Sequence, residues 1–343
     1  MKDILLKLGA RLSAYDNALF LWHDKGNKLM GILASHVDDF VFAGSKYFHN
    51  KVIAELKQSL LVSVHSTGTF KYLGMTIKQY DDNVIEINQD PYIPSITMIE
   101  MSRQVVNRSD KLDTCEKENL KRLSGQMNWV TSHTRPDLSF ETCVMSNPGK
   151  HPSVKMLHDA NKAVKKLKSG SVSINFVSLG EPHLLEVVAY SDATYASLED
   201  GSSQGAFVIF VRGHNEKMVP IAWQSKKLTR VTKSPLASEA LALSEAADAA
   251  LLVATMIKEI FRLGVIPHIQ CYCDNKSLIN NLVSSRIVSD RRLRVDIARI
   301  KEMVERNEIN VHWIIGKNQL ADALTKRGAS TESLLNVLSK NEL

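Results

Sequence analysis

The stretch Leu184-Leu-Glu-Val-Val-Ala-Tyr-Ser-Asp-Ala-Thr194 decides how the second half of this chain folds. Its residues are largely apolar, and turn formers bound it at 180–182 and at Gly201. A short apolar run of this kind predicts a strand that is buried on both faces, near the middle of a sheet. The strand carries Asp192 at its far end. A buried carboxylate is costly unless a cation meets it, so Asp192 is a candidate metal ligand; the alternative is that it caps the next turn.

The residues that follow predict a mixed sheet with helices. Strand patterns at 204–211 and 220–224 continue the first strand as an antiparallel meander. An Ala- and Leu-rich stretch at 238–260, free of Gly and Pro, predicts a long helix with Glu239 in its first turn. The later elements are a short strand at 269–275, a basic helix at 290–306, a strand at 311–315 and a last helix opened by 318–325.

Four carboxylates hold comparable positions in these elements. Asp192 and Asp274 stand at strand ends, and Glu239 and Asp322 stand in the first turns of helices. Such ends can meet at one edge of the sheet, where four acids would repel one another and their pKa values would rise. Two Mg²⁺ ions, which take oxygen ligands, would turn this repulsion into a binding site. Two ions about 4 Å apart activate a water on one side of a phosphodiester and stabilise the departing oxygen on the other, which is a nuclease arrangement.

Four short motifs carry these acids. They are Ser191-Asp-Ala-Thr194, Ser238-Glu-Ala-Leu-Ala-Leu243, Tyr272-Cys-Asp-Asn275 and Asn318-Gln-Leu-Ala-Asp-Ala-Leu-Thr-Lys326. In this order, with Ala-Trp-Gln-Ser-Lys-Lys at 222–227, they resemble the RNase H domain of copia-type LTR retrotransposon polyproteins. The resemblance implies a nuclease for the RNA strand of RNA:DNA hybrids, with two Mg²⁺ or Mn²⁺ ions. It also implies that the catalytic and metal-binding residues are Asp192, Glu239, Asp274 and Asp322.

The first part of the chain holds a second acidic signal. Residues 31–44 predict a hairpin with Asp38 and Asp39 at its tip, although Asp-Asp pairs also occur at ordinary turns. Together with the strand pattern at 70–77, the hairpin resembles the palm of the copia-type reverse transcriptase, with His36 where the family usually has Tyr. The paired aspartates would then be metal ligands of a polymerase remnant. Segments 87–93 and 134–140 extend the resemblance through the thumb and connection, so that it covers about residues 5–326.

We therefore expect an α/β chain in three parts. These are a partial reverse-transcriptase palm at 1–80, a helical thumb- or connection-like segment at 81–180, and an RNase H-like mixed five-stranded sheet with helices at 181–343. The family takes its first polymerase metal ligand from an earlier palm strand, and neither Asp3 nor Asp16 lies in such a strand. We expect no DNA synthesis by this chain as given.

Charge and composition favour an intracellular protein, either cytoplasmic or nuclear, that binds nucleic acid. The net charge is +6, and the excess of Lys and Arg is clustered. The clusters are Lys162, Lys165, Lys166 and Lys168; Lys226, Lys227, Arg230 and Lys233; and Arg291, Arg292, Arg294 and Arg299. Charge runs are usually solvated faces, but the last two flank the acids in sequence and suit phosphates. We expect neither a membrane span nor a signal peptide, and the four cysteines suggest small buried residues rather than disulfides.

Some features leave alternatives open. The loop before Asp322 lacks the His found in relatives outside the copia group; His312 falls in the preceding strand, and Lys317 is left to contact phosphate. Trp223 and Tyr190 suit core packing in their strands. The chain is either an RNA-degrading enzyme, a non-catalytic nucleic-acid-binding relic, or a piece of a longer active reverse transcriptase. The sequence does not give its oligomeric state.

Overall fold

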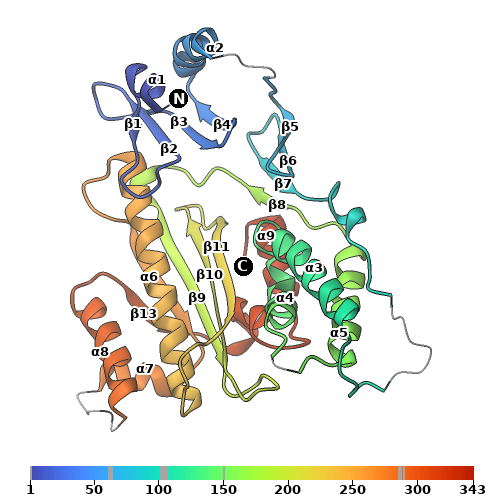
Figure 1. Ribbon diagram of the computed structural model, residues 1–343. Helices are drawn as coiled ribbons and strands as arrows, with labels where there is room; N and C mark the ends of the chain where they lie inside the picture. Colours follow the sequence, from blue (N-terminus) through green and yellow to red (C-terminus); the bar gives the residue numbers. More distant parts are fainter. Residues whose placement is uncertain (1, 61–64, 101–106, 150, 285–287, 289) are drawn as a thin grey trace.

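The computed structural model describes residues 2–60, 65–100, 107–149, 151–284, 288 and 290–343 (Figure 1). Its strands form a four-stranded, a second four-stranded and a five-stranded sheet. The first sheet is antiparallel, in the order β1 (Arg11–Leu12), β2 (Leu19–His23), β3 (Leu29–His36) and β4 (Asp39–Gly44). The helices α1 (Lys2–Lys7), η1 (Phe48–Ile53) and α2 (Ala54–Ser59) accompany it.

The Phe48 side chain is the reason why two positions of this first sheet are occupied by glycine. Its ring is fully buried against β3 and β4. A Cβ atom on Gly31 or Gly44 would overlap the Phe48 ring, so neither position accepts a larger residue without a shift. The N-terminal sheet therefore has its own small core, in which Trp22 also packs edge-on against Phe48.

The second sheet joins distant parts of the chain. It has the antiparallel order β5 (Thr69–Tyr72), β6 (Met75–Gln79), β7 (Ile85–Asn88) and β8 (Ile174–Phe176). Between β7 and β8 lie η2 (Ile93–Ser95), α3 (Thr114–Thr131), η3 (Pro136–Leu138), α4 (Ser139–Ser146) and α5 (Val154–Lys168). This sheet pairs strands from both sides of the boundary expected at residue 80, so the three-part division stays a proposal.

The helical segment is organised around a buried ion pair. Arg135, which is 3% exposed, donates from Nε and Nη2 to the two carboxylate oxygens of Asp137, at 2.9 and 3.0 Å. Its Nη1 donates to the carbonyl of Leu167 at the end of α5, at 3.1 Å. The Thr-Arg-Pro-Asp motif thus ties the turn after α3 to the end of α5. Asp113 opens α3 with a capping box in which Glu116 is the partner.

The five-stranded sheet confirms the expected fold class. Its order is β11 (Met218–Lys227), β10 (Gln204–Arg212), β9 (Glu186–Thr194), β12 (His268–Cys273) and β13 (Asn310–Trp313). β9 is central, antiparallel to β10 and parallel to β12. Val187 and Ala189 face the core under α6 (Pro235–Phe261), while Val188 and Tyr190 face the opposite core. The strand is therefore buried on both faces, as its apolar run predicts.

Further helices complete this part of the chain. They are η4 (Pro182–Leu184), α7 (Lys276–Val283), α8 (Arg291–Glu305), η5 (Gly316–Asn318), η6 (Leu320–Leu324) and α9 (Glu332–Lys340). Tyr190 is 3% exposed and packs in the core, while the half-buried Trp223 also donates from Nε1 to the carbonyl of Thr131, at 2.7 Å. Cys271 and Cys273 are buried as expected, whereas Cys115 is exposed.

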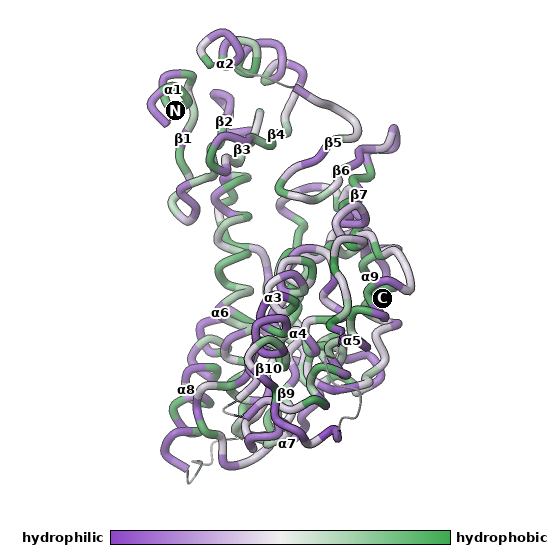
Figure 2. The backbone as a smooth tube through the Cα atoms, turned by 45° about the vertical axis from the view of Figure 1, so that its right-hand side comes forward, coloured by the Kyte–Doolittle hydropathy of each residue, from purple (hydrophilic) through white to green (hydrophobic). Residues whose placement is uncertain are grey.

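The long helix α6 corrects one expectation and refines another. Among the described residues it is long and apolar enough to cross a membrane by length and composition, contrary to the expectation that no segment is (Figure 2). Half of its most apolar window is buried inside the protein, as in a core helix. Ser234 caps the helix and Pro235 is its first residue, so Glu239 lies in the second turn rather than the first.

Candidate metal centre

The four acids named from the sequence converge at one end of β9. Ligand oxygens of Asp192, Asp274 and Asp322 all lie within 4.8 Å of one another. Ligand atoms of Glu239, Cys273 and Asp274 do the same. Asp274 belongs to both groups, so the four carboxylates form one continuous cluster. The acids therefore gather at one end of the central strand, although Glu239 and Asp322 do not lie in the opening turns of α-helices as expected.

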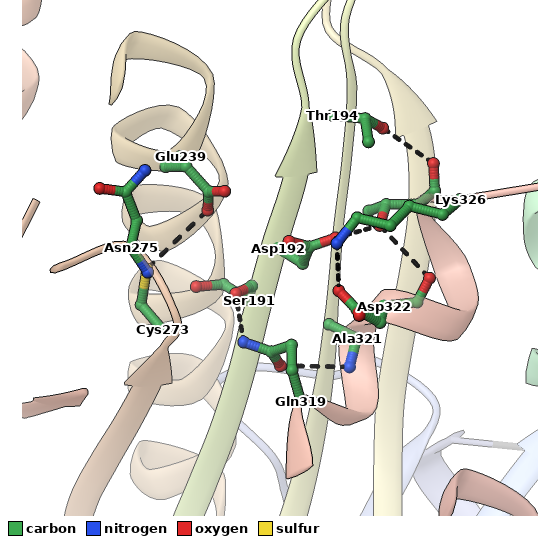
Figure 3. Close-up of polar contacts among 11 residues, drawn as sticks. Ser191, Asp192, Thr194, Glu239, Cys273, Asn275, Gln319, Ala321, Asp322 and Lys326 are labelled. Carbon is green, nitrogen blue, oxygen red and sulfur yellow. Dashed lines mark hydrogen bonds and ion pairs between the residues drawn. The ribbon is translucent and has the colours of Figure 1, made fainter. Parts of the chain in front are cut away.

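Each acid is placed by a different element. Asp192 lies inside β9 and is 1% exposed, and Glu239 extends from α6 (Figure 3). Asp274 follows the last residue of β12. The Trp313 indole on β13 donates to the backbone carbonyl of Asp274, at 3.0 Å. Asp322 lies in η6, a short 3-10 helix, and not in the opening turn of the last α-helix as the sequence suggests.

Gln319 holds the Asp322 segment against the central strand. Its side-chain amide donates to the carbonyl of Ser191, at 3.0 Å, and its side-chain oxygen accepts from the backbone of Ala321 (Figure 3). Gln319 is 5% exposed, so both bonds are sheltered from water. Because Ser191 precedes Asp192, this link fixes η6 beside the acid on the central strand.

Thr325 and Thr194 form a second link between the same elements. The Thr325 hydroxyl, which is fully buried, donates to Oδ2 of Asp192. The Thr194 hydroxyl donates in turn to the backbone carbonyl of Thr325, at 2.8 Å. These bonds orient the Asp192 carboxylate and leave its other oxygen for a further partner.

Burial and mutual repulsion perturb the acids strongly. Burial is the largest cause that raises the pKa of Asp192 to about 6, and the neighbouring Asp322 and Asp274 add to it. Burial also raises the pKa of Glu239 to about 9, with the nearby Asp192 and Asp274 as further causes. The pKa of Asp274 is raised as well, again chiefly by burial. Ionised together, these groups need a cation.

The donor set fits a divalent ion that prefers oxygen. The carboxylates form two overlapping groups, each of which could hold a metal ion. Cys273 is the one candidate ligand in these two groups that is not a carboxylate. Its Sγ lies 3.8 Å from Oε2 of Glu239, and burial raises the pKa of its thiol. A site dominated by carboxylates suits Mg²⁺ or Mn²⁺ better than a thiophilic metal.

Lys326 is a site residue to which the sequence analysis assigned no role. Its Nζ lies 2.5 Å from Oδ1 of Asp322 and 3.5 Å from Oδ2 of Asp192 (Figure 3). Burial lowers the pKa of Lys326, but the surrounding carboxylates, Asp192 foremost, raise it to about 12. Lysine stands four residues after Asp322 in the sequence, so a helical spacing was the signal that could have found it.

Asp38 and Asp39 lie elsewhere. Val37 and Asp38 form the turn between β3 and β4, Asp39 begins β4 opposite His36, and both aspartates are exposed. Neither belongs to a group of ligands that could share an ion within the part of the chain that the structure describes. The N-terminal sheet contacts the far end of α6, where Glu259 bonds Ser13. Glu239 and Glu259 are about 30 Å apart along the helix at 1.5 Å per residue.

Many residues of the second and third basic clusters have acidic partners. Lys226 pairs with Glu245 at 2.8 Å, and Arg230 makes two bonds to Asp296, at 2.8 and 3.0 Å. Further pairs join Lys227 to Asp200 and Arg299 to Asp248. This pairing weakens the positive potential beside the acids. The idea that these clusters hold phosphates stays a prediction.

The sheet is mixed: β11, β10 and β9 pair in antiparallel fashion, and β9, β12 and β13 are parallel. Acids gather at the end of the central strand. This arrangement defines an RNase H-like fold. Over 95% of its length the chain is similar to the Retrovirus-related Pol polyproteins from transposons RE1 and RE2 of Arabidopsis thaliana, at 25% and 24% identity. The resemblance to retrotransposon Pol polyproteins that the motifs predict is confirmed. The chain spans 22% of the length of these relatives. No protein-family model matches it.

Solved structures similar to the chain include two RNases H. One is RNase H1 from the archaeon Halobacterium salinarum, with 21% identity, a TM-score of 0.31, and coverage of 43% of this chain and 97% of that one. Another is LC11-RNase H1 in complex with an RNA/DNA hybrid, with 16% identity, a TM-score of 0.31, and coverage of 41% and 94%. A foamy viral protease-reverse transcriptase with dsDNA covers 82% of this chain and 55% of its own, with 15% identity and a TM-score of 0.23.

Proposed function

We propose that the C-terminal part of this chain hydrolyses the RNA strand of RNA:DNA hybrids with divalent cations. The observation that carries the proposal is the convergence of Asp192, Glu239, Asp274 and Asp322 from four separate elements. Mg²⁺ ions held there would supply a nucleophilic water and stabilise the departing oxygen. The two relatives that match 95% of the chain are Pol polyproteins, which supports a nucleic-acid substrate.

The residues of the chain have distinct parts in this proposal. Asp274 belongs to both halves of the cluster and Asp192 to one of them, and both would bind and align the cations. Glu239 and Asp322 complete the ligand set from opposite sides of β9. Thr325 and Gln319 keep η6 and the Asp192 carboxylate in register, which preserves the spacing that the reaction needs. Preference for the RNA strand would come from contacts with 2′-hydroxyls in the minor groove.

The N-terminal part is proposed to carry no DNA synthesis by itself. Asp38 and Asp39 are exposed on a hairpin, and within the described ranges no third acid lies near enough to share an ion with them. A two-metal polymerase site needs further ligands for both ions. Templated incorporation in a primer-extension assay with this chain alone would disprove the proposal.

A specific observation favours one competing function, a nucleic-acid-binding relic. Lys326 makes ion pairs with two of the acids and so competes with a divalent cation. A chain in which this competition always prevails would bind nucleic acid without cleaving it.

One assay separates the two functions. The full chain is incubated with Mg²⁺ and a hybrid labelled on the RNA strand, beside Asp192→Asn and the matched control Asp81→Asn, which changes an exposed turn residue. The hydrolase proposal expects cleavage by the wild type and by Asp81→Asn, with loss in Asp192→Asn. Binding without cleavage by all three proteins would instead support the relic.

A further inference from the structure

The contacts of Lys326 divide the acid cluster into two unequal halves. One half is the group of Asp192, Asp274 and Asp322, and the Lys326 ammonium lies 3.5 Å and 2.5 Å from oxygens of the first and last of these. The other half is the group of Glu239, Cys273 and Asp274, with which Lys326 makes no ion pair within 4.0 Å among the described residues. The positive charge is therefore placed at one of two neighbouring cation positions.

The backbone on either side fixes Lys326 there. The preceding residue, Thr325, is fully buried and bonded to both Asp192 and Thr194. The backbone amide of Lys326 donates to the carbonyl of Asp322, at 3.3 Å, which brings the lysine back over the acid. The Lys326 side chain is 38% exposed, against 1% for Asp192, so its contact with the acids is partly shielded from water. Such shielding makes this pairing stronger than an ordinary surface ion pair.

A divalent ion at the same position would need the same oxygens. An ion such as Mg²⁺ demands a near-octahedral set of oxygens at about 2.0–2.1 Å. An ammonium 2.5 Å from Oδ1 of Asp322 occupies part of the space around that oxygen and so competes with such an ion for it. Two positive centres only a few ångströms apart also repel each other.

We propose that Lys326 is a built-in cation for the Asp192 and Asp322 half of the cluster, so that this chain binds one divalent ion tightly and a second only by displacing the lysine. The tight ion would lie at the half formed by Glu239 and Asp274. This inference rests on the proposed function for its choice of ion. It makes Lys326 a positioning residue that sets how many divalent ions the site holds.

Mn²⁺ binding to the full chain without nucleic acid tests this directly. Free Mn²⁺ is followed by electron paramagnetic resonance during titration of the wild type, Lys326→Met, Lys326→Gln and the control Lys340→Met. Lys340 is exposed in α9, so its substitution removes the same charge away from the acids. The wild type and the control should bind one ion tightly and a second at least about tenfold more weakly. The Lys326 variants should bind the second ion at least about tenfold more tightly than the wild type.

Other results would overturn the proposal. Two Mn²⁺ ions of comparable affinity in the wild type contradict it, and so does a folded Lys326→Met protein that titrates like the wild type. Circular dichroism checks folding; if both Lys326 variants are unfolded, the wild-type stoichiometry alone decides. Failure here is separate from failure of the hydrolase proposal. A chain that cleaves hybrids but holds two equivalent ions disproves only the role of Lys326, while an inactive chain with the expected titration disproves only the hydrolase.

Discussion

Thr325 lies 133 residues after Asp192 in the sequence, and its buried hydroxyl donates a hydrogen bond to Oδ2 of the Asp192 carboxylate. This bond links the central strand of the sheet to the segment that carries Asp322 and Lys326. It fixes the orientation of the most buried acid of the cluster. The geometry of the proposed cation site therefore depends on a hydroxyl that is not itself a ligand.

Replacing Thr325 by Val should slow hybrid cleavage while the protein stays folded. Valine has nearly the same shape but cannot donate, and a hydrogen bond to a charged group contributes about 1.5–3 kcal/mol, so we expect a loss of roughly ten- to a hundredfold in rate. Single-turnover cleavage of a labelled hybrid measures it. Thr325→Ser, which keeps the hydroxyl, should retain most of the activity. Equal rates for Thr325→Val and the wild type would show that the bond has no part in the site.

Stability without divalent ions should fall as pH rises. Burial and the neighbouring acids raise the pKa of Glu239 from 4.5 to about 9, so the folded state keeps a proton that the unfolded state releases. This contribution to the free energy of unfolding is fully present below pH 4.5 and declines until about pH 9, so about 3 kcal/mol of it is lost by pH 7.

Thermal unfolding in EDTA at several pH values checks this dependence. Glu239→Gln, which carries no titrating group, should flatten the profile, and added Mg²⁺ should raise the midpoint of the wild type at high pH. A profile for Glu239→Gln as steep as that of the wild type would contradict the assignment to Glu239. The variant should also lose hybrid cleavage.

The buried pair of Arg135 and Asp137 should be far more sensitive to single than to double substitution. Arg135→Met leaves the Asp137 carboxylate and the Leu167 carbonyl buried without their donors, so we expect a loss of about 3–5 kcal/mol in the free energy of unfolding. Replacing both residues with Met and Leu should recover most of it. Urea denaturation of the three proteins measures the effect, and an equal loss in the double variant would disprove this account.

Glu259 should hold the N-terminal sheet against the end of α6. Its carboxylate, 8% exposed, accepts from the Ser13 hydroxyl at 2.6 Å, from the backbone amide of Ala14 at 2.8 Å and from Arg11 at 3.2 Å. Glu259→Ala removes all three bonds, so amide hydrogen exchange in β1 and β2 should become faster. The exposed Glu305→Ala is the control. Unchanged exchange in Glu259→Ala would mean that other contacts hold the sheet.

The core of the RNase H-like part could be predicted because its signals are local. The apolar run ending in Asp192 and the alanine-rich helix dictate a buried strand and a packed helix, and both formed as expected. The boundaries were less predictable. Ser234 and Pro235 begin α6 earlier than the unbroken apolar pattern suggests, which moves Glu239 into the second turn. Asp322 lies in a 3-10 helix because Gln319 bonds Ser191 and caps that turn.

Contacts between residues far apart in the chain could not be predicted from the sequence. Nothing local shows that Lys326 contacts Asp192, that Thr325 donates to the same carboxylate, or that β8 pairs with β7 across the helical segment. For the basic clusters the sequence overstates the free positive charge, because Lys226 and Arg230 form ion pairs with acids elsewhere in the chain. Charge in the sequence predicts an attraction to polyanions, but tertiary ion pairs decide how much of it remains.

Single-turnover cleavage of an RNA:DNA hybrid by Asp192→Asn, Glu239→Gln, Asp274→Asn and Asp322→Asn tests the central claim most directly. With Mg²⁺ present and folding verified, the wild type should cut the RNA strand only, and each variant should be slower by at least about a hundredfold, since each loses a charged ligand. Retention of the wild-type rate by any two of these variants, or cleavage that persists in EDTA, would show that this acid cluster is not the site of hydrolysis.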